Sequence, residues 1–304
     1  MIEILETLFG LFVCPGFIFS LIVGGLFYWF YRKLRARMQA RIGPPWYQFF
    51  ADVMKLFSKD SIIPSRARGY LFVLAPIFSI IGLLLVVVML PIGACSLMQS
   101  PESLIMAMYF LAFPGLALII AGVSSGSPYG AIGASREARM MVGYELPYVI
   151  SALTLAFHLK SLDIMSIVNY QFENGAFLLK YPLASIASVI CLLPKICRRP
   201  FDAPEADTEI IGGPLTEYSG IPLGLFELVN ALKWFIFPAF AVTLFFGGGT
   251  NIIEFLLKCL GLVILITIID VIFPRFRIDQ SFKFLLKIAL PLAIIDLLRS
   301  VIWI

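Results

Sequence analysis

Charged residues are scarce in this sequence. Asp, Glu, Lys and Arg make up 14% of its 304 residues, whereas 60% are hydrophobic, and the mean hydropathy is +0.96. Soluble domains are about a quarter charged, and so few charges cannot cover so large an apolar surface. The composition therefore excludes a soluble globular monomer, a disordered chain and a collagen-like fibre. It predicts an all-α, polytopic membrane protein.

Metal-ligating residues are also few. The sequence has a single histidine, and its five cysteines form no CxxC pair. These residues are His158, Cys14, Cys95, Cys191, Cys197 and Cys259. The spacing argues against a zinc, haem or iron–sulfur site within this chain. We therefore expect no metal and no cofactor here, and any redox chemistry would belong to other chains.

Long apolar stretches are abundant. Eight have the roughly 20 residues that cross about 30 Å of hydrocarbon. They lie near residues 7–31, 70–92, 103–123, 140–159, 176–197, 224–246, 251–273 and 282–303. No basic residue precedes the first stretch, which is too long for a signal peptide, so we expect a retained anchor. No internal repeat is visible, and residues 1–304 are expected to form a single membrane domain.

Lysine and arginine are concentrated in alternate connections between the spans. The segment 32–69 holds nine of them, and arginine pairs follow in the segments 124–139, 198–223 and 274–281. With eight spans, all four segments fall on one side of the membrane. The positive-inside rule then makes these segments cytoplasmic loops of a plasma-membrane protein, with both termini outside.

The first cytoplasmic loop contains an amphipathic pattern. Apolar residues recur with helical spacing from Trp46 to Phe57, and polar residues such as Asp52 and Lys55 occupy the other face. The pattern predicts a helix of about 14 residues at the membrane interface, with its aromatic face towards the membrane. It is either an interfacial anchor or a helix that closes a cavity or receives a partner. The surrounding bases suit anionic lipid or an acidic partner surface, and nucleic acid is not expected.

The third cytoplasmic loop, RRPFDAPEADTEIIGGPLTEYSG, concentrates carboxylates. If residues 202–210 are helical, Asp202, Glu205 and Glu209 share a face. Their repulsion should then raise at least one pKa, unless Arg198, Arg199 or a partner compensates. Coupled carboxylates at a membrane boundary suit a proton relay, and a solvated acidic loop is the alternative. The prolines and glycines of this loop favour a defined shape. The five acids of the loop are Asp202, Glu205, Asp207, Glu209 and Glu217.

Further acids lie within or near the spans. An acid inside a membrane span is costly and indicates function, which singles out Glu145 and Glu227. Asp270 and Asp296 lie nearer to span ends, where we expect them to be hydrated. Glu137 is expected to pair locally with the arginines beside it. His158 is expected to be a satisfied interfacial residue.

Three segments resemble a known family. QARIGPPWYQFFADVMKLFSKD, GASREARMMVGYELPY and the acidic loop are similar to the signature regions of the NADH dehydrogenase subunit 1 family of complex I. The resemblance covers nearly the whole chain, and its last motif is highly specific. The family also includes the equivalent subunits of membrane-bound [NiFe] hydrogenases and related ferredoxin-driven complexes.

The resemblance implies a membrane anchor between a peripheral redox arm and ion-pumping subunits, which is not catalytic alone. Its implied partners are large and small hydrogenase-like subunits, an iron–sulfur subunit, antiporter-like membrane subunits and the lipid bilayer. Iron–sulfur clusters, and in the hydrogenase branch a NiFe centre, would belong to those partners. The implied chain of buried carboxylates consists of Glu145, Glu205, Asp207, Glu209, Glu217 and Glu227. The implied junction with the redox arm consists of Arg41, Gly43, Pro44, Arg199, Phe201 and Asp202.

Two branches of the family remain open. Asp207 stands where the quinone-reducing branch usually has Glu, and the SREAR and NALKW segments look more like the hydrogenase-type branch, which we favour. The alternative is the quinone-tunnel subunit of a respiratory complex. A stand-alone secondary transporter and an inert structural scaffold are further alternatives.

Overall fold

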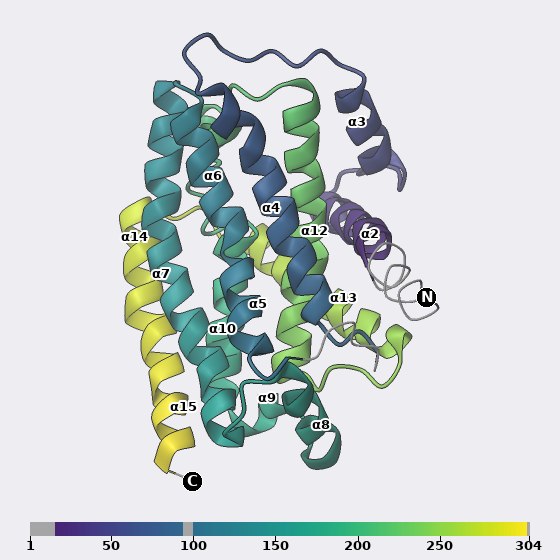
Figure 1. The fold of residues 1–304 in the computed structure, drawn as a ribbon, viewed down its shortest axis with the longest axis vertical. Coiled ribbons are helices and arrows are strands. Elements are labelled where there is room, and N and C mark those ends of the chain that lie inside the picture. Colours follow the sequence, from purple (N-terminus) through teal and green to yellow (C-terminus); the bar gives the residue numbers. More distant parts are fainter. Residues whose placement is uncertain (1–15, 94–99, 303–304) are drawn as a thin grey trace.

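The computed structural model of the protein describes residues 16–93 and 100–302, apart from the side chains of Asp207 and Thr208. All elements assigned within these residues are helical (Figure 1). They are α2 (Phe17–Met38), α3 (Gln48–Phe57), α4 (Gly69–Met89), α5 (Ser103–Leu111), α6 (Phe113–Ser124), α7 (Pro128–Leu159), α8 (Ile164–Asn174), α9 (Phe177–Lys180), α10 (Pro182–Lys195), α11 (Asp207–Ile210), η1 (Gly213–Leu215), α12 (Gly220–Phe245), α13 (Ile252–Ile272), α14 (Ile278–Phe284), η2 (Leu285–Ala289) and α15 (Leu290–Ile302).

The predicted all-α membrane architecture is confirmed. Within the described ranges, six helical segments are long and apolar enough to cross a membrane: α2, α4, the α5–α6 pair, α7, α12 and α13. The predicted fifth span corresponds to α10, which has only 14 residues. The predicted eighth span corresponds to the continuous run of α14, η2 and α15. The count of eight spans therefore stays a prediction, and the anchor predicted near residues 7–31 lies partly outside the described residues.

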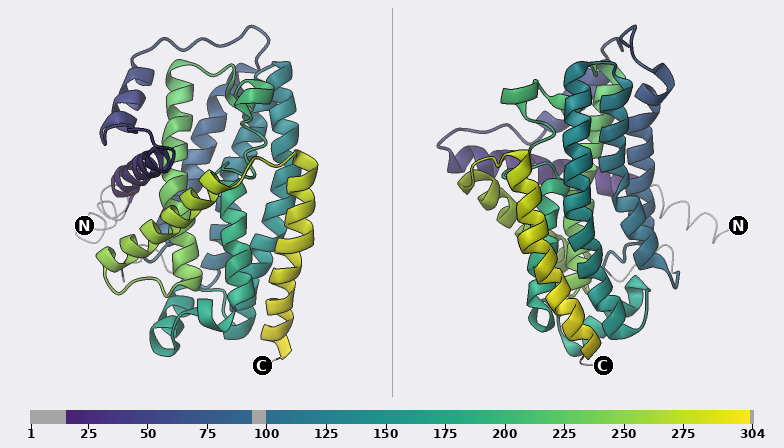
Figure 2. Two further views of the ribbon diagram at one scale, coloured as in Figure 1. Left: turned by 180° about the vertical axis from the view of Figure 1, so that it is seen from behind. Right: turned by 90° about the vertical axis from the view of Figure 1, so that its left-hand side faces the viewer.

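Helix α12 occupies the centre of the bundle (Figures 1 and 2). It packs against α2, α4, α10 and α13, and its side chains from Ala231 to Phe245 are all buried. A helix that is apolar on every side is expected in an interior. The lysine at position 233 is carried inside with it, since Lys233 is only 5% exposed.

Helix α7 is longer than the predicted fourth span. The segment 124–139 was expected to be a cytoplasmic loop, but residues 128–139 form the first turns of α7. Pro128 stands at the first helical position, where its missing N–H costs nothing. As a result, Glu137 and Glu145 lie on one helix, about 12 Å apart along its axis.

The amphipathic helix α3 is present but shorter than expected, with 10 residues instead of about 14. Phe49 and Val53 are buried against Leu228 and Ala231 of α12, so this part of the aromatic face contacts protein rather than lipid. Gly25 of α2 makes the close approach possible, because a Cβ atom there would come within 2.8 Å of the Phe49 ring.

The third cytoplasmic loop is not the helix predicted over residues 202–210, because only Asp207–Ile210 is helical. Pro204 explains the difference, since a proline disfavours helical geometry at the residue before it. The predicted defined shape is confirmed. The buried Phe201 ring lies 5.8 Å from that of Phe276, and Tyr218 stacks on Phe72 at 3.8 Å.

Candidate functional site

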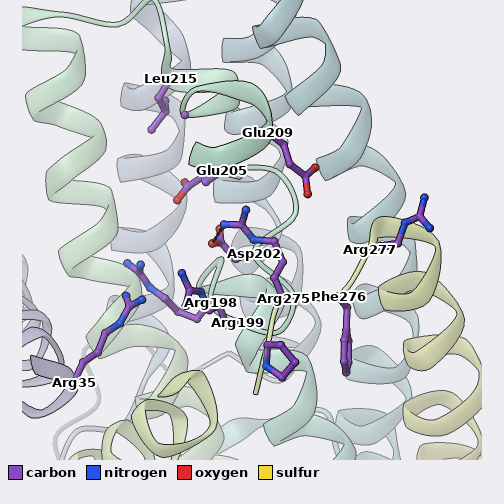
Figure 3. Close-up of a pocket in the computed structure, with 12 residues that line it drawn as sticks. Arg35, Arg198, Arg199, Asp202, Glu205, Glu209, Leu215, Arg275, Phe276 and Arg277 are labelled. Carbon is purple, nitrogen blue, oxygen red and sulfur yellow. Dashed lines mark hydrogen bonds and ion pairs between the residues drawn. The ribbon is translucent and has the colours of Figure 1, made fainter. Parts of the chain in front are cut away.

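The acidic loop forms one wall of a cavity of about 720 Å³. Asp202, Glu205 and Glu209 all face this space, which Figure 3 shows together with the arginines opposite them. The sequence pattern predicted these three acids together on a helix face. The structure brings them together by loop folding instead. The arginines around the cavity are Arg35, Arg198, Arg199, Arg275 and Arg277.

Two of the three acids are paired. Asp202 lies 2.5 Å from Arg275, and Glu209 lies 2.5 Å from Arg136 of α7. Burial nevertheless raises the pKa of Asp202 to about 6, against the lowering effect of its bond to Arg275. Among the described residues, Glu205 has no ion-pair partner. Glu205 thus differs from Asp202 and Glu209, each of which is held by an arginine.

Asp270 contacts two residues that line this cavity, Arg35 and Arg199. It is 2% exposed, so the expectation that it is hydrated was wrong. One of its oxygens accepts a hydrogen bond from Tyr31 at 3.0 Å and lies 3.2 Å from Nε of Arg35. The other accepts from the backbone N–H of Arg199. Asp270 thus joins α2, α13 and the start of the acidic loop.

Arg198 is enclosed by aromatic rings beside the same cavity. Its guanidinium lies 4.9 Å from the ring centre of Tyr31, 5.6 Å from that of Trp234 and 5.9 Å from that of Tyr28. Cation–π contacts of this kind hold a charge where water is scarce. The rings therefore keep a positive charge next to the acids of the loop.

Glu205 also connects the large cavity to a smaller one. A space of about 70 Å³ is lined by Glu205, Glu227, Asn230 and the buried Lys233. Glu227 in turn lines a third cavity, of about 390 Å³, beside α3. Two carboxylates therefore link three adjacent spaces. Both acids were predicted from the sequence, but Lys233 was missed, although a lysine inside an apolar span carries the same signal as an acid.

Glu137 does not pair with its neighbouring arginines, and that expectation was wrong. It is 1% exposed, its Oε1 accepts a hydrogen bond from Tyr144 at 2.8 Å, and its Oε2 has no partner among the described residues. Arg136 pairs with Glu209 instead. Because Lys233, Glu205 and Glu145 all act electrostatically on Glu137, this residue belongs to the site.

Glu145 forms an ion pair that no sequence pattern predicted. Its carboxylate lies 2.5 Å from Nζ of Lys195, whose side chain is 1% exposed. The ammonium also sits 4.5 Å from the ring centre of Tyr148 and 5.1 Å from that of Tyr144. On its other side, Glu145 borders an apolar cavity of about 360 Å³ next to the break between α5 and α6.

The remaining predicted residues are placed elsewhere. Glu217 is half-buried and lines none of these cavities, and the side chain of Asp207 lies outside the described part. Arg41, Gly43 and Pro44 form the turn after α2, where the carbonyl of Pro44 accepts a hydrogen bond from Trp29. They do not line the large cavity. Asp296 is fully buried, so the expectation that it is hydrated was also wrong.

Two further expectations concern metal binding and the single histidine. Between residues 16 and 302, leaving out 94–99, no group of three or more His, Cys, Asp or Glu side chains could hold a metal ion. His158 is hydrogen-bonded, with Nδ1 near the hydroxyl of Tyr181 and Nε2 near Lys180 and Tyr170. The expectation of a satisfied histidine is confirmed.

Comparison with known proteins decides the family. The model of a family described as NADH dehydrogenase matches residues 12–301. The chain belongs to this family. It is 32% identical over 294 residues to a subunit of NADH-quinone oxidoreductase from Syntrophotalea carbinolica, covering 90% of this chain and 88% of that one. It is 31% identical to the subunit of the same name from Geobacillus kaustophilus, with 89% and 86% covered.

A solved structure agrees with this family membership. One chain of the membrane-bound sulfane sulfur reductase, an archaeal respiratory membrane complex, superposes with a TM-score of 0.89 and 28% identity. The match covers 99% of this chain and 100% of that chain. This NADH dehydrogenase family member is thus a multi-pass membrane subunit of a complex I-like oxidoreductase complex.

Proposed function

We propose that this chain couples redox chemistry in a peripheral arm to ion translocation in neighbouring membrane subunits. The observation that carries the proposal is the position of Glu205. It lines the large cavity under the acidic loop and also the small inner cavity that holds Glu227 and Lys233. A charge change at the loop surface can therefore reach groups inside the span α12.

The inner groups continue along α7. Lys233 and Glu205 act on Glu137, and Tyr144 donates its hydroxyl proton to Glu137 in a hydrogen bond. The Tyr144 ring also contacts Lys195, the partner of Glu145. Titratable side chains thus follow one another from the acidic loop to the apolar cavity beside α5. Charges interact more strongly in a protein interior than in water, because the local dielectric constant is lower.

The proposed mechanism is electrostatic. Electron transfer in the arm changes the charge at the junction formed by the acidic loop, and Glu205 takes up or releases a proton in response. The altered charge is passed through Lys233 and Glu137 to the Glu145–Lys195 pair. That pair then biases an ion-pumping subunit. In this scheme the basic loops face the cytoplasm and both termini lie outside.

The hydrogenase-type, ferredoxin-driven branch is the context that we favour. The full-length match to a chain of the sulfane sulfur reductase supports a branch that does not need quinone, because the name of that complex refers to sulfur reduction. Its partner subunits would be hydrogenase-like large and small chains, an iron–sulfur chain and antiporter-like membrane chains. The second candidate is the quinone branch, because the relatives that match along most of the chain carry the name NADH-quinone oxidoreductase.

Partner identification separates these contexts. The tagged complex is purified in gentle detergent, its subunits are identified, and nickel, iron, flavin and quinone are measured. Nickel with iron supports the hydrogenase type, and iron alone supports a nickel-free sulfur-reducing type. Flavin or quinone with iron moves the chain to the respiratory branch. A single chain without partners contradicts the proposal, and solute uptake by that chain in proteoliposomes would identify a transporter.

The coupling role is tested in sealed vesicles that contain the complex. Glu205→Gln is expected to lower ion translocation per electron transferred while the complex still assembles. Glu173→Gln serves as the control, because Glu173 is an exposed acid of α8 and lies outside all of these cavities. Unchanged translocation in Glu205→Gln would instead support an inert scaffold.

A further inference from the structure

The cavity of about 390 Å³ beside α3 is lined by charged side chains of both signs together with apolar side chains. It lies between α2, α3 and α12, and α3 packs directly on the other two helices. Its charged residues are Arg32, Lys55, Lys59, Asp52 and Glu227. Apolar side chains of α3, including the buried Phe49, complete the wall.

The positive charges of this cavity are only partly balanced. Arg32 lies 3.6 Å from Asp52, beyond direct hydrogen-bond distance, and Asp52 also accepts a hydrogen bond from Gln48. Within the described part of the chain, Lys55 and Lys59 have no ion-pair partner. Three cations therefore face two carboxylates. One singly charged anion, such as a phosphodiester, neutralises the cavity, and lysine and arginine are common phosphate ligands.

The surroundings of the cavity suit an amphiphile rather than a free ion. Along α2, Ile18, Ile22 and Leu26 form an exposed apolar row at helical spacing. This row ends about 9 Å before Arg32 along the helix axis. On α3 and the turn before it, Met54 is 72% exposed and Trp46 is 60% exposed. Exposed tryptophan next to lysine and arginine is typical of the boundary between hydrocarbon and water.

The position in the fold agrees with such a boundary. Helix α3 lies in the connection between the end of α2 and the start of α4, close to the start of α12 (Figure 1). It is therefore next to two candidate membrane spans, α2 and the start of α12. Basic pockets between membrane helices on the cytoplasmic side bind anionic head groups.

We propose that this cavity binds the phosphodiester head group of an anionic membrane phospholipid. Lys55, Lys59 and Arg32 hold the phosphate, and the acyl chains lie along the exposed apolar row of α2. The inference does not depend on the coupling role proposed above. It assigns a structural lipid to the cavity between α2, α3 and α12 that Glu227 lines.

The test uses the whole purified complex. It is stripped of lipid with detergent, placed in nanodiscs that contain phosphatidylcholine and phosphatidylglycerol, and released for native mass spectrometry. The variant is Lys55→Gln with Lys59→Gln, both at exposed positions of α3 and the turn after it. The control is Arg66→Gln with Arg68→Gln, which removes the same charge from the same loop outside the cavity.

The wild-type complex and the control are expected to retain one phosphatidylglycerol more than the lysine variant. The affinity of the complex for phosphatidylglycerol should fall roughly thirtyfold in the lysine variant, because each of the two lysines removed contributes about 1 kcal/mol near an anionic lipid surface. Excess inorganic phosphate should not displace it. Equal retention by the lysine variant contradicts the proposal. Displacement by inorganic phosphate identifies a free-anion site, and a bound quinone or other phosphorus-free amphiphile also overturns it.

Discussion

The carboxylate of Glu145 and the ammonium of Lys195 form an ion pair 2.5 Å long in the interior of the helical bundle. The two residues come from α7 and α10, and aromatic rings surround the ammonium. On the opposite side, Glu145 reaches an apolar cavity. The pair therefore stands between that cavity and the Tyr144–Glu137 hydrogen bond, because the Tyr144 ring also contacts Lys195.

Replacement of Glu145 by Gln is expected to abolish ion translocation linked to turnover. It is also expected to destabilise the subunit by about 3 kcal/mol, because Lys195 is left buried without a counter-charge. Adding Lys195→Met removes that buried charge and should recover most of the stability. Thermal unfolding of the purified complex and proton translocation in vesicles measure the two effects separately.

The double variant provides the control for folding. It should assemble like the wild type and still fail to translocate ions. If the double variant translocates ions normally, the pair has no coupling role. If the single variant is as stable as the wild type, Lys195 has another partner or loses its proton.

Glu137→Gln is expected to lower coupling without loss of assembly. The amide keeps the shape of the side chain and can still accept the hydrogen bond from Tyr144, but it cannot carry a negative charge towards Lys233. The expected result is electron transfer that continues with less ion translocation for each electron. Glu173→Gln is the matched control, and equal ion-to-electron ratios in the two variants would remove Glu137 from the relay.

The acids of the site were more predictable from the sequence than its bases. Glu145 and Glu227 were recognisable because an acid in an apolar span is costly. Lys195 and Lys233 carry the same signal. Lys195, however, is the last residue of α10, and a base near a span end is easily counted only as evidence of orientation. Which acid meets which base depends on helix packing, since Glu145 and Lys195 are 50 residues apart, and spacing along the chain does not contain that information.

Local reasoning failed where tertiary packing overrode it. Glu137 stands next to two arginines, but on α7 successive side chains point in different directions, and Arg136 reaches the acidic loop instead. The same loop brings Asp202 and Glu205 to one cavity. It does so without the helix that the periodicity predicted, because Pro204 disfavours helical geometry at the residue before it. The segment and its charge were predictable, but its path was not.

Asp202 is expected to give the complex a stability change near pH 6. Its folded pKa of about 6 lies above the ordinary value of 3.8, so the folded state favours the protonated carboxyl. This contribution is fully present below about pH 4 and is lost as the pH rises through about 6. Asp202→Asn should remove that change from the curve of melting temperature against pH. Asp279→Asn, an exposed carboxyl on α14, should leave it in place.

Asp296 is expected to stabilise the contact between α15 and α10. It is fully buried, and its Oδ2 accepts a hydrogen bond from the backbone N–H of Ala184 at 2.8 Å. Ala184 is the third residue of α10, where N–H groups have no partner inside the helix. Asp296→Ala leaves this donor unsatisfied and should cost about 1–3 kcal/mol. Asp296→Asn should cost less, because the amide oxygen can still accept the bond.

Hydrogen exchange separates this local role from a general loss of packing. In Asp296→Ala, the amides at the start of α10 should exchange faster, whereas those at the centre of α12 should not change. Asp279→Ala is the control, because it removes an exposed carboxyl from the same helical run. If exchange at Ala184 is unchanged, the carboxylate does not cap α10. If exchange rises equally throughout the bundle, the variant has lost packing rather than a single hydrogen bond.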